Sequence, residues 1–260
     1  NLDVLFEKPL SFLVGVPLLT HQLGYTNILP LYAVLLAGTP FALMLAHRRP
    51  RLLLGLAVAG WVAAGQFRLN LPNFPNSGGW FFNPLAWQLI FVVGLLTGTA
   101  MKRGERFLPV RRGWLALAIA YLVLALAVSK IPAVSAAFGH TLWLGGEAGL
   151  PFYLVAFDKT FLTLPRLLHI LALAYVLASW PAVRQVAGAR WVAPLSLLGR
   201  QALPVFALGT VLCFAVQAIK HVLPPSFAVD TALIGAGLGL QLALAWAREA
   251  WKSVPAPARA

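Results

Sequence analysis

Two ionisable residues that could do chemistry lie inside one apolar stretch, FDKTFLTLPRLLHILALAY, which runs from Phe157 to Tyr175. Arg166 and His169 are three positions apart, so a helix would place both side chains on one face. A histidine can serve as a general base near neutral pH, and an arginine can bind a carboxylate or phosphate through paired hydrogen bonds. Together with Asp158, which lies just outside the apolar part, Arg166 and His169 are the candidate catalytic residues.

The surroundings of these side chains favour a functional role, because ionisable groups at membrane depth are costly and usually turn toward partners, substrate or water. A structural role stays open as the alternative. In that case Arg166 would extend to the headgroup level, and His169 would be a satisfied packing residue.

Two other polar clusters combine aromatic rings with amides, in THQLGYTNILPLY from Thr20 to Tyr32 and in NFPNSGGWFFNPLAWQ from Asn73 to Gln88. Sugar-binding grooves use this combination, since ring faces meet apolar CH surfaces and amides bind hydroxyls. An aromatic belt at the membrane interface, with a glycine turn, is the alternative. The candidate substrate-binding residues are Lys159, Trp80, Asn83, Trp87, Gln88, His21, Tyr25 and Asn27.

The chain that carries these clusters is strongly apolar, with 60% hydrophobic and 10% charged residues and a mean hydropathy of +0.81. A soluble domain could not bury so much apolar surface, whereas a lipid-embedded bundle can. Continuous apolar runs of roughly 17 to 25 residues indicate helices rather than a barrel. We therefore predict an all-α, polytopic transmembrane bundle forming a single membrane domain over residues 1–260. The predicted spans are Pro30–Ala46, Leu52–Phe67, Leu85–Met101, Trp114–Ser129, Phe161–Val183, Pro204–Ile219 and Val229–Ala247.

The charged residues separate into two sets of loops. One set carries fourteen Lys and Arg residues with only Glu105 and Glu249, and the other carries six basic and five acidic residues, which together give the net charge of +13. The positive-inside rule makes the basic side, with the C-terminus, cytoplasmic, so the polar clusters face the other compartment. The positive charge then orients helices and meets anionic membrane lipids, and no nucleic-acid partner is expected.

Several common enzyme signatures are missing from the sequence. The five histidines have no metal-ligand spacing, and no P-loop, dinucleotide fingerprint or nucleophile elbow occurs, so we expect no metal and no bound cofactor. The single cysteine, Cys213, cannot form an intrachain disulfide. The pairs Gly94 with Gly98 and Gly235 with Gly239 match the GxxxG pattern, which predicts close helix packing.

Seven spans and a cytoplasmic tail place Asn1 on the far side of the membrane. No start signal precedes Pro30. We therefore expect the chain to be the C-terminal portion of a longer protein, with an odd number of further spans before it if that protein's N-terminus is cytoplasmic.

Four strings in order, THQLGYTNILPLYAVLL, GGWFFNPLAWQLIFVVG, FDKTFLTLPRLLHILALAYVLA and PLSLLGRQALPVFALG, resemble the OpgC family of polytopic bacterial inner-membrane proteins, which is related to the acyltransferase-3 group. The resemblance implies transfer of succinyl groups from cytoplasmic succinyl-CoA to osmoregulated periplasmic glucans. It also implies about ten spans with both termini in the cytoplasm.

The same resemblance implies an arginine, aspartate and histidine motif in a first helix, and these 260 residues contain no such segment. We therefore assign the candidate residues to an acceptor or transfer pocket. Arg200, in LLGRQALP, is the candidate donor-binding residue, because a guanidinium can bind the donor phosphates. A membrane anchor on the basic side is the alternative for Arg200.

Other functions compete with this hypothesis. A glycan or lipid transporter or flippase would use similar aromatic clusters, although no convincing internal repeat supports one. An O-acetyltransferase acting on another cell-surface glycan and a structural membrane subunit also stay open. A photoreceptor is disfavoured, since Val229–Ala247 contains no lysine for a Schiff base. The sequence does not define an oligomeric state.

Overall fold

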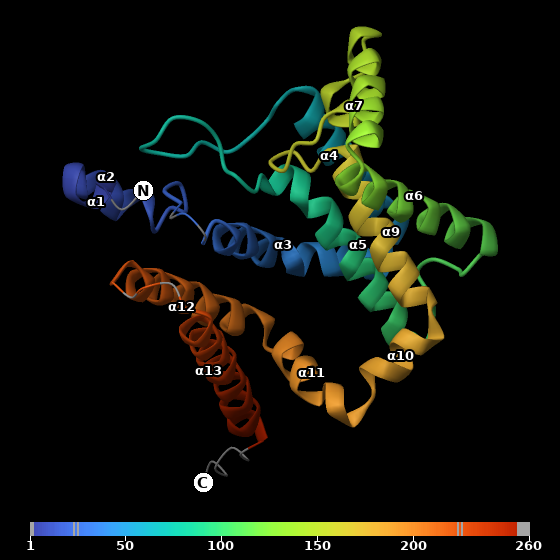
Figure 1. Ribbon diagram of the computed structural model, residues 1–260. Coiled ribbons are helices and arrows are strands. Elements are labelled where there is room, and N and C mark those ends of the chain that lie inside the picture. Colours follow the sequence, from blue (N-terminus) through green and yellow to red (C-terminus); the bar gives the residue numbers. More distant parts are fainter. Residues whose placement is uncertain (1–2, 23, 25, 223, 225, 254–260) are drawn as a thin grey trace. The chain divides into compact units, whose positions relative to one another are not determined.

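The computed structural model describes residues 3–22, 24, 26–222, 224 and 226–253. These residues form helices and no β-strand, and one isolated antiparallel bridge joins Pro72 and Gly79. The predicted all-α fold is therefore confirmed. Figure 1 shows the helices in chain order.

The chain divides into two compact units, Asn1–Ser179 and Trp180–Ala260. A single membrane domain over residues 1–260 stays a prediction. The first unit contains α1 (Asp3–Glu7), α2 (Pro9–Gly15), α3 (Ile28–Arg48), α4 (Pro50–Gln66), α5 (Pro84–Lys102), α6 (Arg112–Lys130), α7 (Pro132–Glu147), α8 (Phe152–Val155) and α9 (Leu164–Ser179). The second contains α10 (Pro181–Ala187), η1 (Arg190–Val192), α11 (Ala193–Arg200), α12 (Ala202–Val222) and α13 (Phe227–Ser253).

Each predicted span falls on a helix: α3, α4, α5, α6, α9, α12 and α13. By length and composition, five of the described helices could cross a membrane, or six if α9 and α10 form one broken span. Helices α4 and α9 are the shortest of the seven, with 17 and 16 residues. Helix α9 ends at Ser179, before the predicted Val183, because Pro181 follows and cannot continue the hydrogen-bond ladder.

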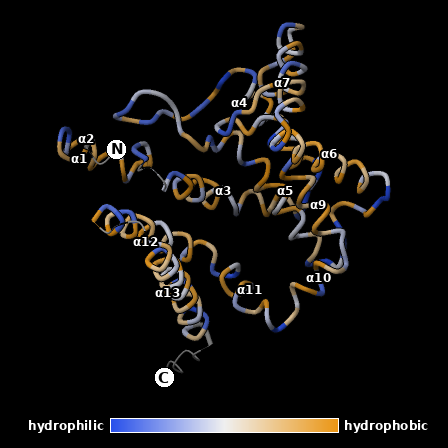
Figure 2. The backbone as a smooth tube through the Cα atoms, in the orientation of Figure 1, coloured by the Kyte–Doolittle hydropathy of each residue, from blue (hydrophilic) through white to orange (hydrophobic). Residues whose placement is uncertain are grey.

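Apolar side chains cover the outer faces of the long helices, and Figure 2 shows hydrophobic residues along α3, α6, α12 and α13. Phe41 on α3, Leu117 on α6 and Ile234 on α13 are each more than half exposed. Water would make such surfaces prone to aggregation, whereas lipid tails solvate them. The surface therefore suits a membrane protein.

Two helices, α7 and α8, lie between the fourth and fifth predicted spans, in a stretch where the sequence predicts no span. Prolines at the starts of both explain where they begin, since Pro132 occupies the first turn of α7 and Pro151 precedes α8. Helix α7 ends at Glu147, and Gly149, two residues later, has a φ of +86° in the left-handed region that glycine adopts most easily. With 16 residues and several polar ones, α7 lacks the apolar run by which a span is recognised.

The core of the first unit lies where α4 meets α5, α8 and α9. Trp61 of α4 packs edge-to-face against Tyr153 of α8, with ring centroids 5.1 Å apart. Gln88 of α5 donates a hydrogen bond of 2.7 Å to the Ala57 carbonyl of α4. Gly65 of α4 also makes a close contact in this core, because an added Cβ would lie 2.6 Å from the Tyr153 Cβ.

Within each of the two units, the described residues do not form the close contacts that the GxxxG pairs predict. An added Cβ at Gly94, Gly98, Gly235 or Gly239 would meet no described atom within 4 Å. The motif supplies a flat helix face but does not specify which neighbour uses it.

Gly65→Ala is expected to lower the free energy of unfolding by about 1–3 kcal/mol, because the new methyl group overpacks the contact with Tyr153. Gly55→Ala in the same helix is the matched control, since its Cβ would meet nothing within 4 Å. The control should unfold at the same temperature or slightly higher, because alanine favours helix over glycine by about 1 kcal/mol. Thermal unfolding in detergent measures both. Equal stability of the two variants would contradict the close α4 to α8 contact.

Candidate functional site

The loop of residues 156–163 joins α8 to α9 and is held by its own side chains. Asp158 Oδ1 accepts a hydrogen bond of 2.8 Å from the Phe161 N–H, and the Asp158 N–H donates one of 3.0 Å to Thr163 Oγ1. Such Asx turns give a short loop a defined shape. Thr163 is fully buried, and its carbonyl accepts from the backbone N–H groups of Arg166 and Leu167. Asp158 therefore shapes the entrance to α9, and this turn explains why the helix begins at Leu164 rather than at Phe161.

Two tryptophans attach this loop to the rest of the first unit. Trp61 Nε1 of α4 donates a hydrogen bond of 2.9 Å to the Leu162 carbonyl. Trp87 Nε1 of α5 donates one of 2.9 Å to the Lys159 carbonyl. The bonds span 101 and 72 residues of sequence. The start of α5 and the start of α9 therefore lie at the same end of the unit, as the alternating direction of the spans predicts.

A pocket of about 400 Å³ opens at this end, a size typical of small-molecule sites. One wall is aromatic: the rings of Phe81 and Phe82 meet edge-to-face at 4.9 Å, and those of Phe82 and Trp87 do the same at 4.9 Å. Edge-to-face contacts of this kind stabilise one another and fix the ring positions. The lining residues are Phe81, Phe82, Trp87, Lys159, Leu162, Pro165, Arg166, His169 and Ile170.

The polar part of the pocket is basic. Arg166 Nη2 donates to the Phe157 carbonyl at 3.4 Å, while Arg166 Nε is enclosed without a hydrogen-bond partner. Lys159 and His169 are exposed at the pocket. None of the three forms an ion pair with a described residue, and no described Asp or Glu lines the pocket. The arrangement offers an imidazole and two cations beside an aromatic wall.

Three of the predicted substrate-binding residues form hydrogen bonds within the fold. Asn83 is fully buried and caps α5, accepting from Leu85 N–H at 3.0 Å and donating to the Leu69 carbonyl at 2.6 Å. Trp80 is buried, and its Nε1 donates to a backbone carbonyl of the loop that precedes α5. Gln88 is bonded to α4. These residues position Trp87, which does line the pocket.

The first polar cluster lies apart from the pocket lining. His21 is buried beside Phe12 of α2, with ring centroids 5.3 Å apart, and its backbone N–H donates to the Gly15 carbonyl. Asn27 precedes α3 without a side-chain cap bond. Tyr25 falls outside the described residues.

Arg200, the predicted donor-binding residue, belongs to the second unit. Its Nε pairs with Glu249 Oε1 at 3.5 Å, and the buried Gln201 donates to Glu249 Oε2 at 3.0 Å. Gln201 Oε1 in turn accepts from Arg248 Nε at 3.3 Å. The network joins the junction between α11 and α12 to the end of α13, while Lys220 and Asp230 pair at 2.7 Å where the end of α12 meets the start of α13. Donor binding by Arg200 stays a prediction.

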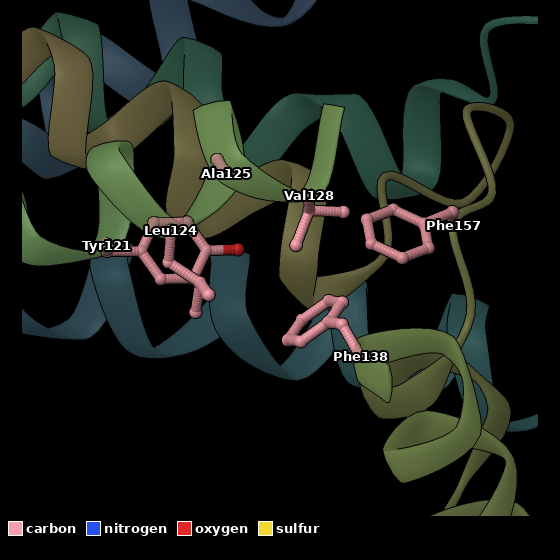
Figure 3. A pocket seen from close by; sticks show the side chains of 6 residues that line it. All are labelled: Tyr121, Leu124, Ala125, Val128, Phe138 and Phe157. Carbon is pink, nitrogen blue, oxygen red and sulfur yellow. The ribbon is translucent and has the colours of Figure 1, made fainter. Parts of the chain in front are cut away.

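A second pocket lies between α6, α7 and the loop, and Figure 3 shows the side chains that line it. Its volume of about 30 Å³ accommodates little more than one water molecule, so it cannot hold a sugar or an acyl group. Phe138 of α7 and Phe157 of the loop face each other here, with ring centroids 5.9 Å apart. Since the Phe157 carbonyl accepts from Arg166, α7 supports the same loop that forms the larger pocket.

Sequence reasoning missed two pocket residues, Phe81 and Phe82. They lie between Trp80 and Asn83, just before a predicted span. Aromatic residues at such a position are also typical of an interfacial belt. The available signal was the run of three consecutive aromatic residues. The contact between the rings of Phe82 and Trp87 is what distinguishes a pocket wall from an interfacial belt of aromatic residues.

Comparison with known proteins identifies a family. The family described as OpgC protein matches residues 1–253, which include all the residues that line both pockets. No curated protein and no solved structure matches the chain. Because the match covers nearly the whole sequence, the chain belongs to the OpgC family.

Proposed function

We propose that this protein transfers a succinyl group, with succinyl-CoA as the cytoplasmic donor, to osmoregulated periplasmic glucans. Membership of the OpgC family supports a glucan-modifying, acyltransferase-like role in general. The observation that carries the proposal is the larger pocket, because it places a histidine and two cations opposite an aromatic wall. Aromatic faces suit sugar rings, and the imidazole suits proton transfer.

The reaction assigns a role to each part of the pocket. A glucan ring packs on Phe82 and Trp87 and directs a hydroxyl group toward His169. The hydroxyl oxygen attacks the acyl carbonyl carbon, a C–O ester bond forms, and the bond between the acyl carbon and its carrier breaks. His169 takes the hydroxyl proton and passes it to the leaving group. Lys159 and Arg166 attract anionic parts of the reactants.

We also propose that the pocket faces the periplasm and that the protein lies in the bacterial inner membrane with a cytoplasmic C-terminus. In the first unit, the loop of residues 103–111 carries several basic residues, and Tyr175 near the end of α9 donates to the Pro109 carbonyl at 2.9 Å. The pocket lies at the start of α9. The basic loop and the pocket are therefore at opposite ends of this helix, which supports the topology from the positive-inside rule.

Expression of the complete gene product in a bacterial host that lacks the activity tests the proposal. Anionic substituents should appear on periplasmic glucan, detected as later elution from an anion exchanger and as added succinyl mass. Glucan that stays neutral, although the protein is inserted in the membrane at normal levels, would contradict the function.

A further inference from the structure

The larger pocket contains positive charge that no described residue neutralises. Arg166 has only the 3.4 Å bond to the Phe157 carbonyl, and its enclosed Nε has no partner. Lys159 adds a second cation to the same lining. The nearest carboxylate in sequence, Asp158, accepts from the Phe161 N–H and is not part of the lining. A partly buried guanidinium without a counter-ion favours an anionic ligand.

The positions of the basic groups limit the size of such a ligand. Arg166 and His169 share a face of α9, and three residues of helix correspond to about 4.5 Å along the axis. The backbone of Lys159 is fixed beside the pocket because its carbonyl accepts a hydrogen bond from Trp87 Nε1. A ligand that reacts at His169 and carries its negative charge at Arg166 must therefore be short.

We propose that Arg166, together with Lys159, determines acyl specificity by binding the free carboxylate of a short dicarboxylic acyl group while its reacting carbonyl lies at His169. The inference rests on the proposed acyl transfer and adds which residues select the acyl group. A guanidinium bonds both carboxylate oxygens at once, and partial exclusion of water strengthens these bonds. A neutral acyl group such as acetyl leaves Arg166 unpaired, and a site with an unpaired polar group discriminates strongly against such a ligand.

The test compares two donors, succinyl-CoA and acetyl-CoA, with the detergent-solubilised complete gene product and neutral glucan as acceptor. The wild-type protein should transfer succinyl faster than acetyl. In Arg166→Gln the ratio of succinyl to acetyl transfer should fall by about 10- to 100-fold, the value of a hydrogen bond to a charged group. Arg166→Lys should keep part of the preference, because it retains the charge but loses the paired geometry.

Lys130→Gln is the matched control, since it removes an exposed positive charge that does not line the pocket. It should leave the ratio unchanged. If Arg166→Gln loses both activities equally, or neither, the ratio of succinyl to acetyl transfer stays at the wild-type value. That result would overturn the specificity role while leaving the proposed function in place. If Arg166→Gln does not fold, Arg166→Lys decides, and an unchanged ratio in that variant would overturn the role. A wild-type protein that transfers neither group would overturn the proposed function itself.

Discussion

His169→Ala is expected to reduce acyl transfer to glucan by about 10²- to 10⁴-fold, the usual contribution of a positioned general acid or base. The imidazole lines the pocket beside Arg166 and is the group there best suited to take a proton from a sugar hydroxyl. Because the side chain is exposed and forms no hydrogen bond with a described residue, folding and insertion should not change. Transfer rates in membranes and thermal unfolding in detergent measure both effects.

Leu168→Ala provides the control for His169→Ala. Leu168 is the preceding residue of α9, is 40% exposed and does not line the pocket. Its truncation should leave the transfer rate within a few-fold of the wild type. A wild-type rate in His169→Ala would remove this histidine from the site.

Asn83→Ala should lower the free energy of unfolding by about 1–3 kcal/mol. Loss of an N-cap costs about 1 kcal/mol, and loss of a hydrogen bond to a backbone carbonyl costs about 0.5–1.5 kcal/mol more. Both losses occur here, since the Asn83 side chain caps α5 and bonds the Leu69 carbonyl from a fully buried position. Denaturant titration in detergent measures the change. Transfer should also decrease, because Trp87 lies in the turn that Asn83 caps.

Asn83→Ser separates the two contributions. The serine hydroxyl can still cap α5 but lacks the amide that donates to the Leu69 carbonyl, so its stability should lie between those of the wild type and the alanine variant. The sequence predicts a substrate-binding role for Asn83. If Asn83→Ala unfolds like the wild type and only the affinity for glucan decreases, that prediction is correct and the structural role is wrong.

The sequence was sufficient to predict the helical fold and to place several candidate residues at one end of the first unit. The seven apolar runs all lie on helices, because lipid requires every backbone group to be bonded within the segment. Alternating span direction brings Trp87 to the same end as Lys159, Arg166 and His169, and all four line one pocket.

Other roles depend on tertiary contacts that a local pattern does not contain. Asn83 and Gln88 look like ligand-binding amides, but they bond backbone carbonyls from distant parts of the chain. Which carbonyls need a partner is decided only when α4, α5 and the loops come together. Asp158 similarly stabilises the turn before α9, since its Oδ1 accepts a hydrogen bond from the Phe161 N–H. Helix α7 was missed because its supporting contact, Phe138 with Phe157, is not local.

Cysteine labelling in intact cells tests most directly whether this pocket takes up glucan from the periplasmic side. Lys159→Cys lines the pocket and Arg106→Cys lies in the basic loop, each in a Cys213→Ser background because the native cysteine is exposed. A membrane-impermeant maleimide should label position 159 in intact cells and position 106 only after permeabilisation. Neutral glucan should slow labelling at position 159. Labelling of position 106 from outside, or labelling of position 159 at a rate that glucan does not change, would contradict the account.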